Sequence, residues 1–331
     1  MGVKTLAFET TICTCVEAGA LEHQALLLVE SLRTFGGRYA NLPFMAVKPR
    51  AGPAISRLTR QAFDRLGVTF IDKPLSVEFA WWDMANKPAA MRYAEENAKT
   101  PCVTWMDGDM AVLQEPLTFA PPPDADFMAR AGEATDVASS GADDRVEYWR
   151  QLCDMFNLDF DRFPIITSFP DSKSIRAYWQ GGLYTYRTSS RFGAMHGEIY
   201  GRMLNGAIAS KYAGIYHMDQ VSIALTVQAL GLRHAEYDPR MNFNVNPLDK
   251  IGALRLPIED VRILHYHGSL SPQSYDWART LLEKLPSDRL DLFDRFAPLR
   301  SPPLATRVHR KLYSLSRAGK LRDLERRVVQ Y

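Results

Sequence analysis

Cysteine is scarce in this chain: only four of its 331 residues are cysteines, at positions 13, 15, 102 and 153. They are too few and too scattered to build a disulfide framework, and no two of them have the C-x-x-C spacing of a structural zinc site. We therefore expect a protein of a reducing compartment that is held together by its apolar core.

An excess of charge of one sign is also absent. Forty basic side chains stand against thirty-eight acidic ones, which leaves a formal net charge of +2. A dedicated nucleic-acid binder carries a concentrated basic field, so we expect no nucleic-acid partner. With 46% hydrophobic and 24% charged residues, the composition is that of a folded globular protein and excludes disorder for the body of the chain.

Long apolar runs are missing as well. No run approaches the roughly 18 residues that are needed to cross a bilayer. The first residues lead into apolar sequence without the basic start, long apolar segment and cleavage site of a secretory signal. We expect a cytoplasmic protein, either free in solution or bound peripherally at the inner face of the membrane.

Short apolar runs alternate with amphipathic ones over the first hundred residues, which is typical of strands and helices that take turns in a mostly parallel sheet. We expect strands over residues 5–8, 43–47, 68–71 and 102–106, with helices over 21–35, 53–66 and 88–98 between them. Further along, the pattern predicts strands over 182–187 and 261–266 and an amphipathic helix over 218–230. The sequence therefore indicates an α/β fold.

Two acidic residues follow the strand expected at 102–106, in the order Asp107, Gly108, Asp109. Open α/β sheets bind ligands at the carboxyl ends of their strands. Two carboxylates so close together repel each other, and a divalent cation relieves that repulsion while it gains two oxygen ligands. Gly108 lets the backbone turn tightly and lets a phosphate approach. The other interpretation is an ordinary Asp-Gly turn after a strand.

Two histidines end another apolar run, in the order His265, Tyr266, His267, Gly268. A histidine at this strand end would complete an Asp, Asp, His ligand set, and its nitrogen favours Mn²⁺ over Mg²⁺. The alternative for a single histidine is a core or surface residue without a ligand. Two of them at a strand end, in a chain that also has Asp107 and Asp109, favour the metal site.

Several short motifs stand in the order seen in GT-A fold glycosyltransferases. After the Asp-Gly-Asp sequence come YWQGGL at 178–183, MDQ at 218–220, NFN at 242–244 and HYHG at 265–268. In these motifs the chain resembles the retaining nucleotide-sugar transferases of family 8, which include glycogenins and bacterial lipo-oligosaccharide galactosyltransferases. The resemblance spans residues 1 to about 285. It implies a GT-A, Rossmann-like α/β fold with a mixed, mostly parallel central sheet flanked by helices.

The resemblance also implies roles for individual residues. It makes Asp107, Asp109 and His265 the ligands of Mn²⁺ or Mg²⁺, and it places Asp219 and Gln220 near the anomeric carbon of the donor sugar. Asp219 has a second interpretation from the sequence alone, as the N-cap of the helix that follows it. The donor-binding residues that the resemblance implies are Phe8, Glu9, Thr10, Thr11, Asp107, Gly108, Gln180, Gly181, Gly182 and Gly268.

One expected charge is absent. After the histidine motif the family usually has Lys-Pro-Trp, whose lysine pairs with phosphate, whereas this chain has Ser269, Leu270 and Ser271. We expect Lys87 or Arg92, near the start of the helix at 88–98, to supply the charge in its place. An exposed, solvated cation is the other interpretation of each.

The C-terminal residues 301–331 differ from the rest of the chain, because they carry eight lysines or arginines and only two acids, with leucines and a valine at roughly helical intervals. Such a tail either binds anionic lipid or packs on the domain as a helix. We expect a GT-A domain over residues 1–300, with a nucleotide-binding half at 1–125 and a sugar and acceptor half at 126–300, followed by this basic tail.

The resemblance, together with the acids and histidines that could hold a metal, implies a metal-dependent glycosyltransferase that retains the configuration of the sugar. It would move the sugar from a nucleoside diphosphate, with UDP expected, to a hydroxyl of a glycan, a lipid-linked saccharide or a small polyol. A sugar nucleotidyltransferase shares the sheet and the paired acids, but it normally has a Gly-rich basic loop after the first strand, which residues 9–15 lack. The alternative outside the enzymes is a non-catalytic protein of the same fold that binds a nucleotide or glycan. The intact set of Asp107, Asp109 and His265 argues against it.

Overall fold

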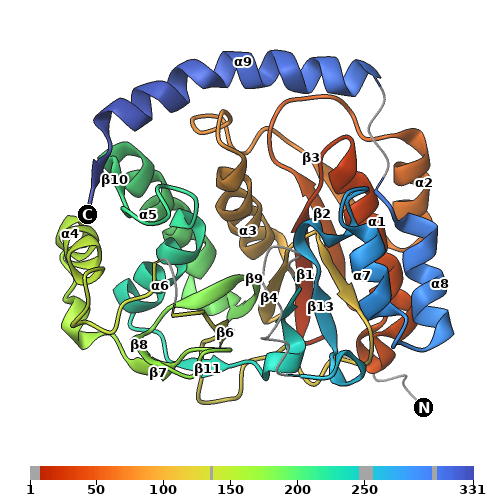
Figure 1. Cartoon of the computed structure of the whole chain (residues 1–331), viewed down its shortest axis with the longest axis horizontal. Coiled ribbons are helices and arrows are strands. Elements are labelled where there is room, and N and C mark those ends of the chain that lie inside the picture. The colour runs from red at the N-terminus through yellow and green to blue at the C-terminus, as the bar shows by residue number, and fades with distance from the viewer. Residues whose placement is uncertain (1–7, 135–136, 246–255, 300–303) are drawn as a thin grey trace.

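A seven-stranded sheet forms the centre of the protein (Figure 1), in a computed structural model that describes residues 8–134, 137–245, 256–299 and 304–331. The strand order is β11-β6-β9-β4-β1-β2-β3, and β9 runs antiparallel to both of its neighbours while the other pairs are parallel. The strands of this sheet are β1 (Thr10–Cys15), β2 (Phe44–Lys48), β3 (Val68–Asp72), β4 (Cys102–Met106), β6 (Phe127–Ala131), β9 (Trp179–Arg187) and β11 (His234–Glu236).

Helices cover both faces of the sheet because neighbouring strand residues point to opposite faces. Ile12 and Ala46 pack with α1 and α2 on one face, whereas Cys13 and Val47 pack with α3, α5 and α6 on the other. The helices of the described chain are α1 (Ala20–Phe35), α2 (Arg57–Arg65), α3 (Asn86–Asn97), α4 (Val146–Phe156), α5 (Phe192–Gly206), α6 (Met218–Ala229), α7 (Tyr275–Leu282), α8 (Ser287–Phe296) and α9 (Leu304–Arg327).

A second, three-stranded sheet stands beside the first and has the order β12-β13-β5. Its antiparallel pair β13 and β5 has His265 opposite Met110, so the late histidine is fixed next to the chain that has just left β4. The remaining strands are β5 (Met110–Val112), β7 (Ile165–Thr167), β8 (Ser174–Arg176), β10 (Ile208–Ala209), β12 (Phe243–Asn244), β13 (Ile263–His265) and β14 (Val329–Gln330).

The predicted α/β architecture is confirmed, and most of the predicted strands and helices agree with the observed ones to within a few residues. The first strand is an exception. Residues 5–7 lie outside the described part of the chain, and the strand is β1, which begins at Thr10. Its threonines look polar in the sequence, but they are buried and bond across the sheet, as Thr10 does to Thr104 at 2.9 Å between their hydroxyl oxygens.

The helix predicted as amphipathic at 218–230 is also different in one respect. It forms α6, but its residues from Met218 to Val227, apart from Gln220, are buried. Since α6 lies between α5 and strand β9, it presents no broad polar face to solvent.

The basic tail forms α9, which crosses the molecule along the top of Figure 1 from the side of α2 and α8 to that of β10. Leu324 is its buried anchor, and β14 pairs with β10 just beyond the helix. The packing of the tail on the domain as a helix, one of its two interpretations, is therefore observed. Across the described residues, none of the helices combines the length and the apolar character that a membrane crossing requires.

Candidate active site

The turn from Asp107 to Asp109 joins the two sheets. It lies between the end of β4 at Met106 and the start of β5 at Met110. The N–H of Asp107 donates to the carbonyl of Gly182 on β9 at 2.8 Å, which fixes the turn to the sheet edge. The turn opens onto a cleft of about 1210 Å³. Sites for one small ligand measure roughly 300–1,000 Å³, so this cleft has room for two substrates.

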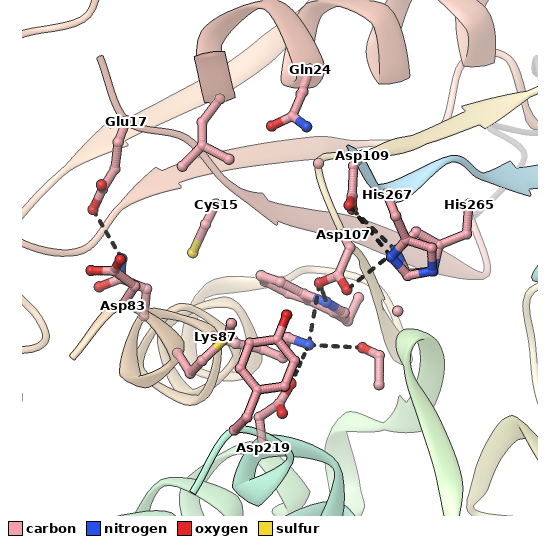
Figure 2. A pocket seen from close by; sticks show the side chains of 18 of the residues that line it. Cys15, Glu17, Gln24, Asp83, Lys87, Asp107, Asp109, Asp219, His265 and His267 are labelled. Atoms are coloured by element: carbon pink, nitrogen blue, oxygen red, sulfur yellow. Dashed lines mark hydrogen bonds and ion pairs between the residues drawn. The ribbon is translucent and has the colours of Figure 1, made fainter. Parts of the chain in front are cut away.

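The two histidines lie directly against this turn (Figure 2). The Nε2 atom of His265 is 3.1 Å from Oδ1 of Asp109 and 3.8 Å from Oδ2 of Asp107. The Nδ1 atom of His267 is 3.9 Å from Oδ2 of Asp109. The structure therefore brings together the acids and histidines that stand more than 150 positions apart in the sequence.

Burial and charge shift the pKa values of this cluster in different directions. Burial opposes the charged form of His265, but the carboxylate of Asp109 outweighs it and raises the pKa of His265. Burial likewise opposes ionisation of Asp109, and His265 outweighs it and lowers the pKa of Asp109. Burial, together with the charge of His265, lowers the pKa of His267 to about 3. His267 is therefore neutral at neutral pH and has a nitrogen lone pair available.

The donor atoms suit a divalent transition metal. Asp109, His265 and His267 each offer one ligand atom, and these atoms lie within 4.8 Å of one another. The Nδ1 atom of His265 is buried without a hydrogen-bond partner among the described residues. Imidazole nitrogen with carboxylate oxygen fits Mn²⁺ better than Mg²⁺. The predicted ligand set has Asp107 in the place of His267. Asp107 lies 3.8 Å from His265, but it does not belong to the group whose ligand atoms lie within 4.8 Å of one another.

Lys87, at the start of α3, contacts polar groups of three other segments that line the cleft. Its Nζ atom donates to Oδ2 of Asp219 at 2.8 Å and to the carbonyl of Gly181 at 3.0 Å, and it lies 3.2 Å from Oδ1 of Asp107. Burial alone would lower the pKa of Lys87, but the charges of Asp107 and Asp219 outweigh it and raise that pKa. The ammonium group is therefore permanently charged, and it fixes two carboxylates from distant parts of the sequence.

Two glycines of β9 leave the space that these side chains occupy. A Cβ atom on Gly182 would lie 2.5 Å from Cε1 of His265, closer than packed atoms approach. A Cβ atom on Gly181 would lie 3.0 Å from Cγ of Gln220 and 3.3 Å from Nζ of Lys87. The close approach of the β9 backbone to the site thus explains the two consecutive glycines.

Asp219 and Gln220 stand in the first turn of α6 and both line the cleft. The helix begins at Met218 with His217 as its N-cap, so the interpretation of Asp219 as the N-cap is wrong. The carboxylate of Asp219 turns to Lys87 because an ion pair of two buried groups satisfies both charges. The Nε2 atom of Gln220 lies 3.1 Å from Nδ1 of His217, which orients its side-chain amide.

The cleft is also lined by a network of polar side chains around Glu133, which is not predicted from the sequence. Glu133 accepts from Nε2 of Gln180 at 2.9 Å and from Nδ2 of Asn244 at 3.0 Å, and it lies 3.5 Å from Nη2 of the buried Arg130. Asn244 belongs to the NFN motif of the sequence. Glu133 and Arg130 belong to no motif, since Glu133 stands in an irregular loop and Arg130 in an apolar strand. No local signal in the sequence could have identified them.

The remaining predicted donor residues divide into two groups. Gly108, Gln180, Gly181 and Gly182 line the cleft. Gly268 follows His267 on a short 3-10 turn and does not belong to the lining. Its predicted contact with phosphate therefore stays a prediction.

The predicted placement of four residues beyond the first strand is wrong, because that strand begins later than expected. Thr10 and Thr11 lie inside β1, where they pair with Cys102 and Val103 at the end of β4 opposite to the Asp107 turn. Phe8 and Glu9 precede the strand at that same end. The segment that follows β1 and does line the cleft contains Glu17 and Ala18.

The prediction that Arg92 could supply the missing positive charge also needs correction. Its side chain is 63% exposed and pairs with Glu96 one turn further along α3, at 3.1 Å. It does not line the cleft, which α3 reaches with Asn86 and Lys87 of its first turn. Of the two cations that the sequence offers for the missing charge, Lys87 alone reaches the site.

Comparisons with known proteins give a matching family and a large number of similar solved structures, among them those of WbbM and LgtC. Residues 12–231 match the family model of the Rhodobacterales glycosyltransferase domain. The apo structure of WbbM, a bifunctional glycosyltransferase, superposes with a TM-score of 0.50 at 12% identity, over 89% of this chain and 53% of that one. The galactosyltransferase LgtC, in complex with donor and acceptor sugar analogs, gives a TM-score of 0.49 at 15% identity, over 90% and 99% of the two chains.

The present chain thus spans about half the length of WbbM, and the likeness to that structure concerns the fold. Among curated proteins, the sequence has no significant match.

Proposed function

The chain belongs to the Rhodobacterales glycosyltransferase domain family and has the GT-A fold, and from this we propose the particular reaction that it catalyses. It transfers a sugar from a nucleoside diphosphate, with UDP as the expected nucleotide, to a hydroxyl group of an acceptor. The transfer depends on a divalent metal and retains the configuration at the anomeric carbon. The acceptor is a glycan, a lipid-linked saccharide or a small polyol.

One observation carries this proposal: the acids of the Asp107–Asp109 turn meet His265 of β13 and the nearby His267 at the sheet edge, beside the buried pair of Lys87 and Asp219. The acids and histidines that could hold a metal and the carboxylate of Asp219 thus line one cleft, with Lys87 between Asp107 and Asp219 (Figure 2). Transfer of a sugar from a diphosphate needs both, because negative charge gathers on the leaving group while positive charge gathers on the sugar.

The residues divide the chemistry between them. Asp107, Asp109 and His265 would hold the metal, with His267 beside them. A divalent cation bound there supplies Lewis-acid stabilisation of the diphosphate leaving group, worth several kcal/mol. Asp219, whose carboxylate is oriented by Lys87, stabilises the positive charge at the anomeric carbon.

Around them, neighbouring side chains orient the sugar. Gln220 and the backbone of Gly181 lie beside Asp219 and are placed to contact the hydroxyl groups of the sugar. Gln180, which donates to Glu133, extends this polar wall along the cleft.

The corrected position of the first strand also bears on the nucleotidyltransferase alternative. The loop that follows β1 is Val16-Glu17-Ala18-Gly19. It has one glycine and an acidic side chain, whereas a nucleotidyltransferase places a Gly-rich basic loop there to hold the triphosphate. The loop therefore favours the glycosyltransferase over the nucleotidyltransferase.

The outer face of α9 supports peripheral contact with a membrane as part of this proposal. Leu304, Val308, Leu312 and Leu315 recur at helical spacing and are 50–72% exposed, and the same helix carries eight cations over its length. A basic helix with an exposed apolar row binds anionic bilayers. Sedimentation with phosphatidylglycerol vesicles, but not with phosphatidylcholine vesicles, is the expected result. Failure to sediment with either would refute the membrane contact.

A thermal-shift panel tests the central proposal. UDP, GDP, TDP and CMP are each added with and without Mn²⁺, since a ligand at about 100 times its dissociation constant stabilises the native state by about 2.7 kcal/mol. We expect a shift for UDP that requires Mn²⁺, after which hydrolysis of UDP-sugars would identify the sugar. No shift for any nucleotide would contradict the proposal.

A further inference from the structure

Helix α9 forms one wall of the cleft, although it lies beyond the segment that matches the glycosyltransferase family, which ends at residue 231. In Figure 1 it passes above α3, from the side of α2 to that of α5 and β10. The face that it turns to the cleft consists of Thr306, His309, Arg310, Tyr313, Ser314 and Arg317.

The C-terminal end of α9 is anchored by backbone and apolar contacts. Leu324 is 1% exposed and belongs to the core that α5 and α6 share. The N–H of Val329 donates to the carbonyl of Ala207 at 2.9 Å, and that of Tyr331 to the carbonyl of Ala209 at 3.1 Å. These contacts fix one end of the helix to the domain.

The part of α9 above the cleft is attached by polar contacts instead. Arg310 donates from Nη2 to the carbonyl of Ala18, directly after β1, at 2.9 Å. Arg317 donates from Nη1 to Oδ1 of Asp83, just before α3, at 2.7 Å. No apolar side chain of α9 between Leu304 and Arg317 is buried among those that the structure describes. Two arginines and their neighbours therefore hold this length of helix to the body.

Arg50 connects α9 to the strand ends beneath it. Its guanidinium pairs with both carboxylate oxygens of Glu17 and with Asp83. It also lies 4.9 Å from the ring centroid of Tyr313 and donates to the Tyr313 hydroxyl at 3.2 Å. Burial opposes ionisation of Asp83, but its hydrogen bond from Arg317 and the charge of Arg50 outweigh it and lower the pKa of Asp83.

The contacts of α9 fall at one particular end of the cleft. Glu17 and Arg50 follow β1 and β2, and Figure 2 shows Glu17 and Asp83 on the side away from His265, with Cys15 and Asp107 between. A nucleoside diphosphate whose phosphates lie at the metal ligands, and whose sugar lies at Asp219, has room for its base and ribose on the side of Glu17 and Arg50. That side is the one over which α9 passes.

We infer that α9 closes the nucleoside end of the donor site and that Arg310 and Arg317 hold it closed, with Tyr313 as a wall for the base or ribose. This inference rests on the proposed function, since it assigns one end of the same site. The ligand is the nucleoside part of a nucleoside diphosphate, which offers a flat ring and several hydrogen-bond acceptors. The wall offers an aromatic ring and guanidinium groups, which match both features.

The test compares two full-length variants that each lose two positive charges from α9. Arg310→Ala/Arg317→Ala removes the inner contacts, whereas Arg307→Ala/Lys311→Ala removes two exposed cations that do not line the cleft. UDP affinity in the presence of Mn²⁺ is measured by calorimetry. We expect the inner variant to bind about tenfold more weakly, as for one lost hydrogen bond to a charged group, and the outer variant to bind within about twofold of the wild type.

Hydrogen exchange provides a second readout that does not depend on turnover. UDP with Mn²⁺ should slow exchange in α9 of the wild type and of the outer variant, but not of the inner variant. Equal UDP affinity of the inner variant and the wild type would overturn the inference and leave the proposed function intact. Tighter binding by the inner variant would overturn it too, because α9 would then obstruct the site. Absence of UDP binding by the wild type would remove the proposed function, and this inference with it.

Discussion

The sheet edge and helix α9 line the same cleft, but their polar side chains are held in different ways. At the sheet edge, the side chain of Lys87 is 9% exposed and lies between two carboxylates, one from the turn after β4 and one from α6. On α9, Arg317 is 29% exposed and pairs with Asp83, which is 50% exposed. Water and salt screen the second pair far more than the first. The comparison teaches that one side of the cleft is rigid and preorganised, whereas the other is held by contacts that are weak enough to open.

The largest effect that this comparison predicts follows from loss of a charge at the rigid side. Asp109→Asn should reduce the Mn²⁺-dependent affinity for UDP by at least about 100-fold, because a neutral amide replaces a carboxylate ligand. The fold should persist, since the amide keeps the shape of the side chain. Calorimetry with UDP and Mn²⁺ measures the change, and Asp124→Asn, on an exposed residue, is the control. Unchanged affinity in Asp109→Asn would exclude this turn as the metal site.

The two histidines sharpen the same prediction. His265→Ala should weaken Mn²⁺-dependent binding more than His267→Ala does, because His265 lies 3.1 Å from Asp109 and is 4% exposed. His267 lies 3.9 Å from the same carboxylate and is 34% exposed. The reverse order would assign the ligand role to His267 in preference to His265.

A smaller effect is expected from a methyl group placed at the sheet edge. In Gly182→Ala, the added Cβ atom would lie 2.5 Å from Cε1 of His265, so the imidazole must move. We expect a loss of about 1–3 kcal/mol in the free energy of unfolding and at least a tenfold loss in activity. Gly197→Ala on α5 is the matched control, because no atom lies within 4 Å of its added Cβ. A variant with full activity would show that this side of the cleft adapts and would weaken the comparison.

The smallest effect concerns salt. Raising the ionic strength from about 0.01 M to 1 M shortens the Debye length from about 30 Å to about 3 Å, which weakens exposed pairs such as Arg317–Asp83. Hydrogen exchange in α9 should rise by about two- to fivefold, consistent with pairs worth up to about 1 kcal/mol, while exchange in α6 should not change. Equal salt responses of the two helices would remove the distinction between the rigid side and the side that opens.

Much of the fold was predictable because its signals are local. The strand predicted before Asp107 matches β4 residue for residue, and the bounds predicted for the helix at 88–98 lie within two residues of those of α3. Apolar periodicity and turn residues specify such elements within a short window of sequence. The same reasoning gives the wrong position for the first strand, because its sequence TTICTC contains threonines that look polar. Thr10 and Thr11 can be buried only because their hydroxyl groups form hydrogen bonds with other threonines.

The sequence by itself determined which residues can carry the chemistry: the acids of the Asp107–Asp109 turn, the histidines at 265 and 267, and the glycines of β9. Only the tertiary structure decided how they meet. Lys87 and Asp219 are 132 positions apart, and the contact between Arg50 and the hydroxyl of Tyr313 spans 263. Such contacts arise because separate elements pack into one core and bring their ends to one cleft. A local pattern determines an element, but the burial of distant elements against each other determines which of their side chains become neighbours.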